Sequence, residues 1–157
     1  MTFEMQVVSN TPLIGDEDLD SAAKKFFEQI GYLSKGSDPA IPYKIFADFF
    51  LKHPTKAWIV DEIAAELKTS RPTVYRHLNK LKSMDILEEV KLEDEITAKD
   101  GKKMIQVKKG YKLRYSNLSK AWTFVEAHVE AAMDNYRKTI DHLQSTLEKE
   151  KKMVAKK

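Results

Sequence analysis

The sequence predicts a mainly α-helical (α+β) protein, in which a compact domain with a β-hairpin precedes a long C-terminal helix. Three patterns predict it. Residues 60–81 parse as two short helices, residues 86–115 alternate between apolar and polar side chains, and an apolar stripe with heptad-like spacing begins at residue 118. The expected parts are an N-terminal arm and helix over 1–37, a compact domain over 38–117, and a helix with a lysine-rich tail over 118–157.

The most informative part of the chain is residues 60–81, VDEIAAELKTSRPTVYRHLNKL. Asp61 suits the N-cap of its first helix and Ser70 that of its second, because both side chains can accept a hydrogen bond from a first-turn N–H. Pro72 is tolerated in the first turn of the second helix, where no N–H is needed. Two helices joined by so tight a turn are typical of the helix-turn-helix, which lays its second helix in the major groove of DNA.

The second helix has one apolar and one polar face. At about 100° per residue, Val74, Leu78 and Leu81 fall on one stripe and are expected to be buried. Arg76 and Asn79 fall opposite, and these side chains can pair with guanine and adenine respectively. The alternative is an ordinary solvated helix face. The candidate DNA-binding residues of this helix are Ser70, Arg71, Thr73, Tyr75, Arg76, Asn79 and Lys80.

A β-hairpin is predicted directly after the helix pair. Apolar residues recur at every second position on both arms, and Asp100-Gly101 between the arms favours a tight connection. A helix-turn-helix followed by a hairpin is a winged helix. Lys99, Lys102 and Lys103 stand near the predicted tip and suit the DNA minor groove or the flanking backbone. The alternative is a hairpin stabilised by cross-strand ion pairs, since acidic residues crowd its first arm.

The segment SRPTVYRHLNKLKSMDILEEV, with the hairpin and KLRYSNL after it, resembles the winged-helix transcription regulators of the ArsR, MarR and archaeal TrmB groups. The resemblance covers about residues 39–120. Ala64, Val74 and Leu78 match the apolar positions of the family's helix pair. Lys68 departs from the pattern, because Gly is usual at this turn. A positive φ at Lys68 costs about 1 kcal/mol, so either the lysine adopts it or the turn differs.

Charge is distributed unevenly along the chain. The net charge is only +3, but residues 70–116 hold 12 Lys and Arg against 7 Asp and Glu. This surplus on the motif and hairpin is the electrostatic pattern of a phosphate-binding surface. The surplus is modest, so we expect salt-sensitive binding that needs two copies of the chain for useful affinity.

Further helices and a short strand are expected before the motif. Residues 16–30 and 41–52 carry apolar faces at helical spacing, and residues 31–42 form a connection rich in turn formers. Residues 57–60 suit a short strand that pairs with the hairpin. Residues 1–15 are predicted to be an irregular arm.

The C-terminal stretch carries a long apolar stripe. Nine apolar residues from Leu118 to Leu147 are spaced 4, 3, 4, 4, 3, 4, 3 and 4 apart, a heptad-like pattern with one extra residue. A stripe this long favours a helix that packs on a second copy of the chain. The alternative is a helix folded back on its own domain. The predicted dimer-interface residues are Trp122, Val125, Val129, Met133, Tyr136, Ile140, Leu143 and Leu147.

Little in the sequence supports a membrane protein, a metal site or an enzyme. The chain has no cysteine, no stretch near the roughly 20 apolar residues of a membrane span, and no basic-then-apolar N-terminus. We therefore expect a cytoplasmic protein that does not bind a membrane. His128 and His142 lie 14 residues apart, which does not match a zinc pair. No nucleotide loop or nucleophile motif occurs. We expect no catalytic residue, metal or cofactor.

These patterns lead to one hypothesis and one main rival. The hypothesis is a homodimeric regulator of transcription that binds a palindromic site in double-stranded DNA, with repression favoured by family analogy. The rival is a winged helix that binds a protein partner within a transcription or replication assembly. An enzyme is disfavoured. The sequence does not indicate whether a small-molecule effector binds.

Overall fold

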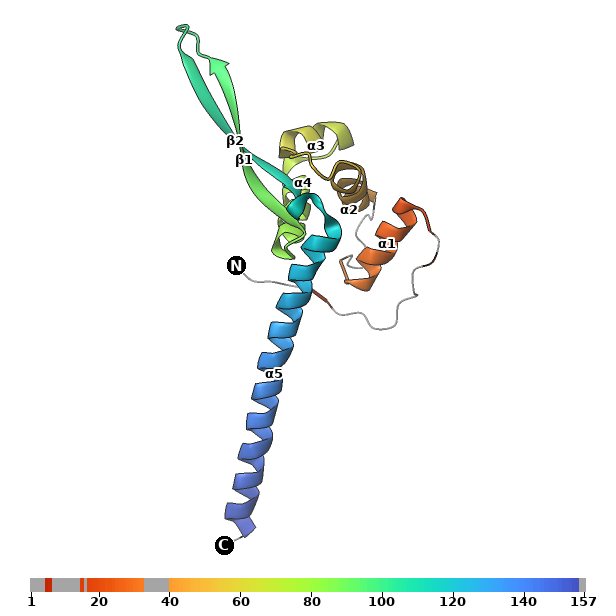
Figure 1. Ribbon diagram of the computed structural model, residues 1–157, viewed down its shortest axis with the longest axis vertical. Coiled ribbons are helices and arrows are strands. Elements are labelled where there is room, and N and C mark those ends of the chain that lie inside the picture. The colour runs from red at the N-terminus through yellow and green to blue at the C-terminus, as the bar shows by residue number, and fades with distance from the viewer. Residues whose placement is uncertain (1–4, 7–14, 16, 33–39, 156–157) are drawn as a thin grey trace. The chain divides into compact units, whose positions relative to one another are not determined.

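The structure is a computed structural model that describes residues 5–6, 15, 17–32 and 40–155 (Figure 1). It comprises two compact units, Met1–Trp122 and Thr123–Lys157. The boundary predicted between residues 37 and 38 lies outside the described residues, as do most of the predicted N-terminal arm and residues 33–39 of the predicted connection over residues 31–42.

Helix α1 (Leu19–Gln29) forms the first element of the first unit. Its N-cap is Asp18, whose carboxylate accepts a 2.8 Å hydrogen bond from the backbone N–H of Ser21. The helix buries Ala23 and Phe27. Its apolar face therefore packs inward, as its spacing predicted.

The helix predicted over residues 41–52 is divided in two. An α-helical turn, α2 (Ala40–Lys44), continues directly into a π-helical segment, η1 (Ile45–Leu51). Most of η1 is buried. The prediction of a helix was correct, but the wider π-helical winding within it was not expected from the spacing of apolar residues. The buried residues of η1 are Ile45, Phe46, Ala47, Phe49 and Phe50.

The predicted helix pair is present as α3 (Val60–Leu67) and α4 (Arg71–Ser83). Asp61 is not the N-cap of α3, and this prediction was wrong by two residues. Ile59 occupies that position, and its N–H donates to the Glu62 carboxylate at 3.1 Å. Lys68 ends α3 in the left-handed conformation, with φ 53° and ψ 44°. A lysine therefore adopts the strained turn that glycine usually provides.

Helix α4 begins and packs as predicted. The Ser70 hydroxyl accepts a hydrogen bond from the N–H of Thr73 at 3.3 Å, which caps the helix. Val74, Leu78 and Leu81 have no exposed surface. They belong to a single core that also contains buried residues of α1, η1 and the hairpin. The predicted buried stripe of α4 is confirmed.

Strands β1 (Leu87–Thr97) and β2 (Lys103–Leu113) form the predicted antiparallel hairpin, which extends beyond the helices (Figure 1). The loop is longer than the two-residue turn that Asp100-Gly101 suggested, because residues 98–102 all lie outside the strands. Only the base of the hairpin contributes to the core, through Leu87, Tyr111 and Leu113. The distal half is exposed because no other element of the described chain covers it.

The short strand predicted before α3 is reduced to one bridge. Trp58 and Tyr111 exchange backbone hydrogen bonds of 2.7 and 2.8 Å. The Trp58 indole N–H also donates to the carbonyl of Phe49 at 3.0 Å. This buried tryptophan therefore joins η1 to the base of the hairpin.

Helix α5 (Leu118–Ala155) follows a 3₁₀ turn, η2 (Arg114–Ser116). Its first residues, up to Trp122, belong to the first unit, and residues 123–155 make up the described part of the second. Within the part of the chain that the structure describes, no helix is both long and apolar enough to cross a lipid bilayer.

The left-handed conformation of Lys68 generates a stability prediction. Lys68→Gly should raise the free energy of unfolding by about 1 kcal/mol, because glycine has no Cβ to strain at positive φ. Ala65→Gly, in the exposed interior of α3, should lower it by about 1 kcal/mol. Urea denaturation followed by circular dichroism measures both variants. A destabilised Lys68→Gly protein would contradict the assigned turn.

Candidate nucleic-acid interface

The outward face of α4 presents the two side chains with the most specific base-pairing chemistry. Arg76 and Asn79 are exposed, and neither side chain forms a hydrogen bond or an ion pair among the described residues. Val74, on the opposite side of the helix, is fully buried. The predicted orientation of these three side chains is confirmed. The guanidinium and the amide are thus available to bases in a major groove.

The N-terminal end of α4 carries hydroxyl groups and one tethered arginine. The hydroxyls of Ser70 and Thr73 lie 2.8 Å apart. Arg71 pairs with Asp61 of α3 at 2.7 Å, but both side chains are more than half exposed, so the pair contributes little to stability. Arg71 can therefore leave Asp61 and pair with a phosphate at little cost in free energy. The free N–H groups of the helix add to the attraction for phosphate.

Tyr75 connects α4 to the base of the hairpin. Its hydroxyl accepts a 3.2 Å hydrogen bond from the Lys109 ammonium, and its ring meets Tyr111 edge-on at 6.2 Å between centroids. Lys109 also lies 3.5 Å from the Glu89 carboxylate. These contacts hold the wing against α4. Tyr75, a predicted DNA-binding residue, therefore makes intramolecular contacts that the sequence pattern did not reveal.

Lys80, a predicted DNA-binding residue, is held by Tyr32, which follows α1. Its ammonium donates to the Tyr32 carbonyl at 2.6 Å and lies 4.2 Å from the centre of the Tyr32 ring. Burial lowers the pKa of Lys80. The Tyr32 hydroxyl also forms a 3.0 Å hydrogen bond with His77 Nδ1. Tyr32 was missed by the sequence analysis, because no local pattern links residues that lie 45 positions apart.

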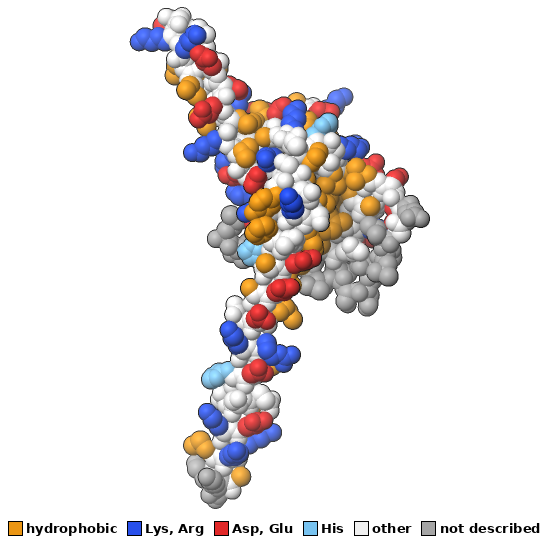
Figure 2. Space-filling model, viewed as in Figure 1, with side chains coloured by type: hydrophobic (Ala, Val, Ile, Leu, Met, Phe, Trp, Pro, Cys, Tyr) orange, Lys and Arg blue, Asp and Glu red, His pale blue; other side chains and the backbone are white. Residues whose placement is uncertain are grey.

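The wing is charged along its length, with basic groups at its tip. Lys99, Lys102 and Lys103 are all exposed, and Figure 2 shows blue side chains at the distal end of the hairpin. Lys103 lies 3.6 Å from Glu95 on the facing strand. Nearer the base, Lys112 faces Glu88 at 3.8 Å. The cross-strand ion pairs of the alternative reading are therefore present, and the tip lysines remain accessible beside them.

The predicted dimer-interface residues differ in exposure. Trp122 is not free for a second chain, because its ring packs edge-on against Phe26 of α1 at 5.5 Å. Val125 has no exposed surface. Trp122 was placed in the interface because it continues the heptad-like spacing, which carries no information about where the helix meets its own domain. The exposed residues of the stripe are Met133, Tyr136, Ile140, Leu143 and Leu147, each more than half exposed, and Val129 is half-buried.

Metal-binding geometry is not found among the described residues, where no three His, Asp or Glu side chains gather as a metal site would need. The charged and amide side chains described above lie on one helix and on the wing.

Comparison with known proteins identifies the domain. A family model described as a helix-turn-helix domain matches residues 42–90. These residues form a helix-turn-helix domain. With the hairpin that follows α4, the first unit contains a winged helix-turn-helix. No curated protein matches the chain in sequence. A solved structure, described as a possible transcriptional regulator from Methanosarcina mazei Go1, is 16% identical, covers 90% of this chain and 98% of its own, and superimposes with a TM-score of 0.43.

His77 generates a pH prediction. Burial, together with the positive charges of Arg76 and Lys80, lowers the pKa of His77 below its ordinary 6.5. The unfolded chain therefore binds more protons, so stability should be lost as pH falls through about 6.5. His77→Gln should flatten this part of the profile, whereas His142→Gln, on an exposed face of α5, should leave it unchanged. Unfolding midpoints between about pH 7.5 and 5.5 measure the effect, and identical slopes in all three proteins would refute it.

Proposed function

We propose that this protein is a transcription regulator that binds a specific sequence in double-stranded DNA as a homodimer. The observation that carries the proposal is the exposure of Arg76 and Asn79 on the second helix of a helix-turn-helix domain whose Val74 is buried. Among winged-helix regulators, we place the chain nearest the ArsR, MarR and TrmB groups. Repression by blocking a promoter is favoured over activation on this analogy alone.

Recognition would divide between bases and phosphates. Arg76 suits a bidentate contact with guanine and Asn79 with adenine, so these two would select the sequence. Ser70, Thr73 and Arg71 lie at the N-terminal end of α4, where the helix dipole attracts phosphate, and would set the register of the helix in the groove. Lys80 and Tyr75 would act mainly by holding α4 in place, because both contact other elements of the chain.

The wing would contact DNA beside the major groove. Lys99, Lys102 and Lys103 are exposed at the far end of the hairpin. Phosphate contacts by such lysines do not distinguish sequences, but they add affinity that falls steeply with salt. We therefore expect strong salt dependence together with base selectivity from α4.

Dimerisation is supported by the exposed apolar stripe of α5. Met133, Tyr136, Ile140, Leu143 and Leu147 are each between 52% and 63% exposed, and they recur at heptad-like spacing. A helix of this kind is not stable alone in water without a partner for its apolar face. A second copy of the same helix presents a matching stripe. Two recognition helices related by a two-fold axis would then meet half-sites about 34 Å apart.

A second candidate function has one observation in its favour. Ile105 and Val107 are 68% and 55% exposed on β2 and face Glu95 and Glu93 across the hairpin. An apolar pair beside acidic groups suits a protein partner better than DNA, as in a winged helix that acts inside a transcription or replication assembly. Absence of a shift of duplex DNA at micromolar protein and low salt would favour this candidate.

The DNA-binding proposal predicts a loss of affinity at Arg76. Selection of bound fragments from genomic DNA provides the target duplex, and gel-shift titration measures the dissociation constant. Arg76→Ala should raise it at least about 10-fold on the selected duplex, since each half-site loses a bidentate contact that contributes about 1–3 kcal/mol of discrimination. Arg76→Lys should recover charge but not selectivity.

The matched control is Arg137→Ala, which removes the same side chain from the exposed surface of α5, where Arg137 pairs with Asp141 at 4.0 Å. Its affinity for the selected duplex should stay within about twofold of that of the unmodified protein. Equal losses in Arg76→Ala and Arg137→Ala would mean that the protein responds to net charge only, which contradicts sequence-specific reading by α4.

The proposed dimer should dissociate when one charge is introduced into the apolar stripe of α5. Ile140→Asp should convert the protein to a monomer and weaken DNA binding at least about tenfold, because two linked half-site contacts become one. Ser145→Asp, an exposed position on another side of α5, is the control and should stay dimeric. Sedimentation equilibrium measures the mass. An unmodified protein that is monomeric at micromolar concentration would refute the dimer.

A further inference from the structure

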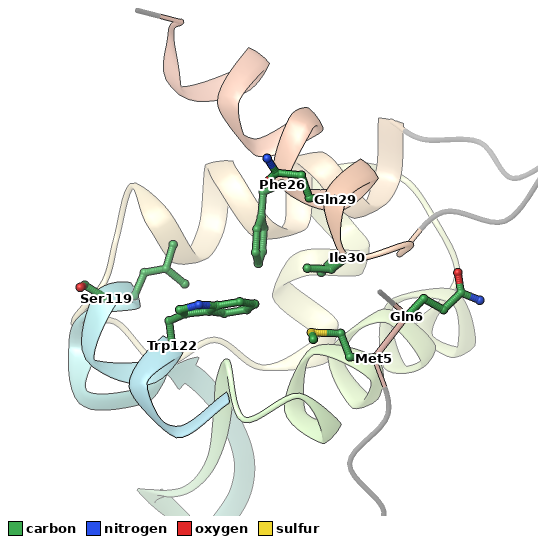
Figure 3. Close-up of a pocket in the computed structure, with 8 residues that line it drawn as sticks. Met5, Gln6, Phe26, Gln29, Ile30, Ser119 and Trp122 are labelled. Atoms are coloured by element: carbon green, nitrogen blue, oxygen red, sulfur yellow. The ribbon is translucent and has the colours of Figure 1, made fainter. Parts of the chain in front are cut away.

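Cavities of the first unit differ in the chemistry of their lining. One of about 680 Å³ lies between α1 and the start of α5, where Figure 3 shows Phe26, Ile30 and Trp122, and no described residue of its lining is charged. Another of about 300 Å³ lies where the beginnings of α3 and α4 meet β2. Charged side chains gather in this second space, which we call the charged cavity. Its charged lining residues are Asp61, Arg71, Lys108 and Lys109.

Positive charge prevails in the charged cavity. Arg71 of α4 and Lys108 and Lys109 of β2 are basic, and Asp61 of α3 is the one acidic residue of the described lining. The Asp61 carboxylate lies 2.7 Å from Arg71 Nε, and the Lys109 ammonium donates to the Tyr75 hydroxyl at 3.2 Å. The Lys108 side chain forms no hydrogen bond or ion pair among the described residues. Such a lining suits an anion.

The position of the charged cavity indicates which anion would reach it, if the proposed DNA-binding function holds. In a bound helix-turn-helix, the N-terminal residues of the second helix contact bases while the first helix crosses the DNA backbone. The charged cavity lies between the beginnings of these two helices, with Asp61 on the first and Arg71 on the second. A duplex read by α4 would therefore bring a backbone phosphate to this cavity.

Asp61 resembles that phosphate in its chemistry. A carboxylate and a phosphodiester each offer a guanidinium two acceptor oxygens and one negative charge. The side chains of Asp61 and Arg71 are 59% and 70% exposed, so their ion pair is weak and open to an incoming anion. Both anions cannot occupy Arg71 without repelling each other. The carboxylate must therefore leave Arg71 when a phosphate binds there.

We propose that Asp61 holds the place of a DNA backbone phosphate in the charged cavity of the free protein, and that the phosphate displaces it from Arg71 when DNA binds. Lys108 and Lys109 complete the phosphate site from the side of the wing. Phosphate contacts carry no sequence information directly. Asp61 therefore lowers the affinity for every duplex by a similar factor, whereas Arg76 selects among sequences.

The first experiment tests the phosphate site without DNA. The probe is inorganic phosphate, titrated at constant ionic strength while NMR follows the backbone amide signals of the cavity residues. The shifts should saturate with a millimolar dissociation constant. Asp61→Asn should lower this constant at least about threefold, because Arg71 loses its competing partner. Asp48→Asn is the matched control, since it breaks the exposed pair of Asp48 with Lys52 at 2.8 Å, and should leave the constant unaltered.

Two results would overturn the phosphate site: shifts that do not saturate, or equal phosphate affinity in Asp61→Asn and the unmodified protein. Circular dichroism shows whether each variant is folded. Lys108→Ala provides a second test that does not depend on the start of α3. It removes a cation without breaking a polar contact among the described residues, and it should raise the dissociation constant at least about threefold. An unchanged constant in this variant would also count against the site.

The second experiment tests whether Asp61 acts through Arg71. Gel-shift titrations compare the unmodified protein, Asp61→Asn, Arg71→Ala and the double variant as a double-mutant cycle. Asp61→Asn should bind the selected duplex and a random-sequence duplex about threefold or more tightly than the unmodified protein, and Asp48→Asn should stay within about twofold. Most of the gain should disappear when Arg71 is already alanine, because no ion pair is then left to break.

Equal gains with Arg71 and with alanine at that position would mean that Asp61 acts on DNA only by its charge, which would overturn the displacement. A gain on the selected duplex alone would contradict a phosphate contact. Failure of the unmodified protein to bind either duplex would overturn the proposed function and the DNA phosphate as the occupant. The phosphate titration would then still decide whether the charged cavity is an anion site.

Discussion

The burial of one apolar stripe on α4 determines which side chains of this helix are exposed. Val74, Leu78 and Leu81 have no exposed surface and share one core with the aromatic residues of α1 and η1. Successive helical residues lie about 100° apart, so the face of α4 opposite the buried stripe points toward solvent. Rotating the helix by one position would bring a lysine and other polar side chains into an apolar core, at a cost of several kcal/mol. The exposure of Arg76 and Asn79 is therefore a consequence of hydrophobic packing rather than of any polar contact they make.

Polar contacts act instead at the two borders of α4. On one border, Tyr32, which follows α1, holds His77 and Lys80. On the other, Tyr75 joins the wing through Lys109. These partners lie outside the helix pair itself, and Tyr32 lies outside the region that matches the helix-turn-helix model. The position of the recognition helix thus depends on elements before and after the motif, which gives those elements a physical means of influencing what α4 binds.

Helix α5 has two environments along one apolar stripe. At its start, Trp122 packs against Phe26 and lines a cavity in the first unit. From Met133 onward, the stripe is exposed in the described chain. The same spacing therefore serves intramolecular packing at one end and, in the proposed dimer, intermolecular packing at the other.

The sequence by itself determined the features that depend on neighbouring residues. Periodicity identified α3, α4, the hairpin and α5, and Ser70 and Pro72 located the start of α4, because capping and amphipathic spacing act within a few residues. Tertiary structure alone decided what depends on residues distant in the chain. It showed that Tyr32 holds His77 and Lys80, that Trp122 packs on its own domain, and that Trp58 pairs with only one residue of the hairpin. A helical pattern predicts which face is buried, but it carries no information about the partner that buries it.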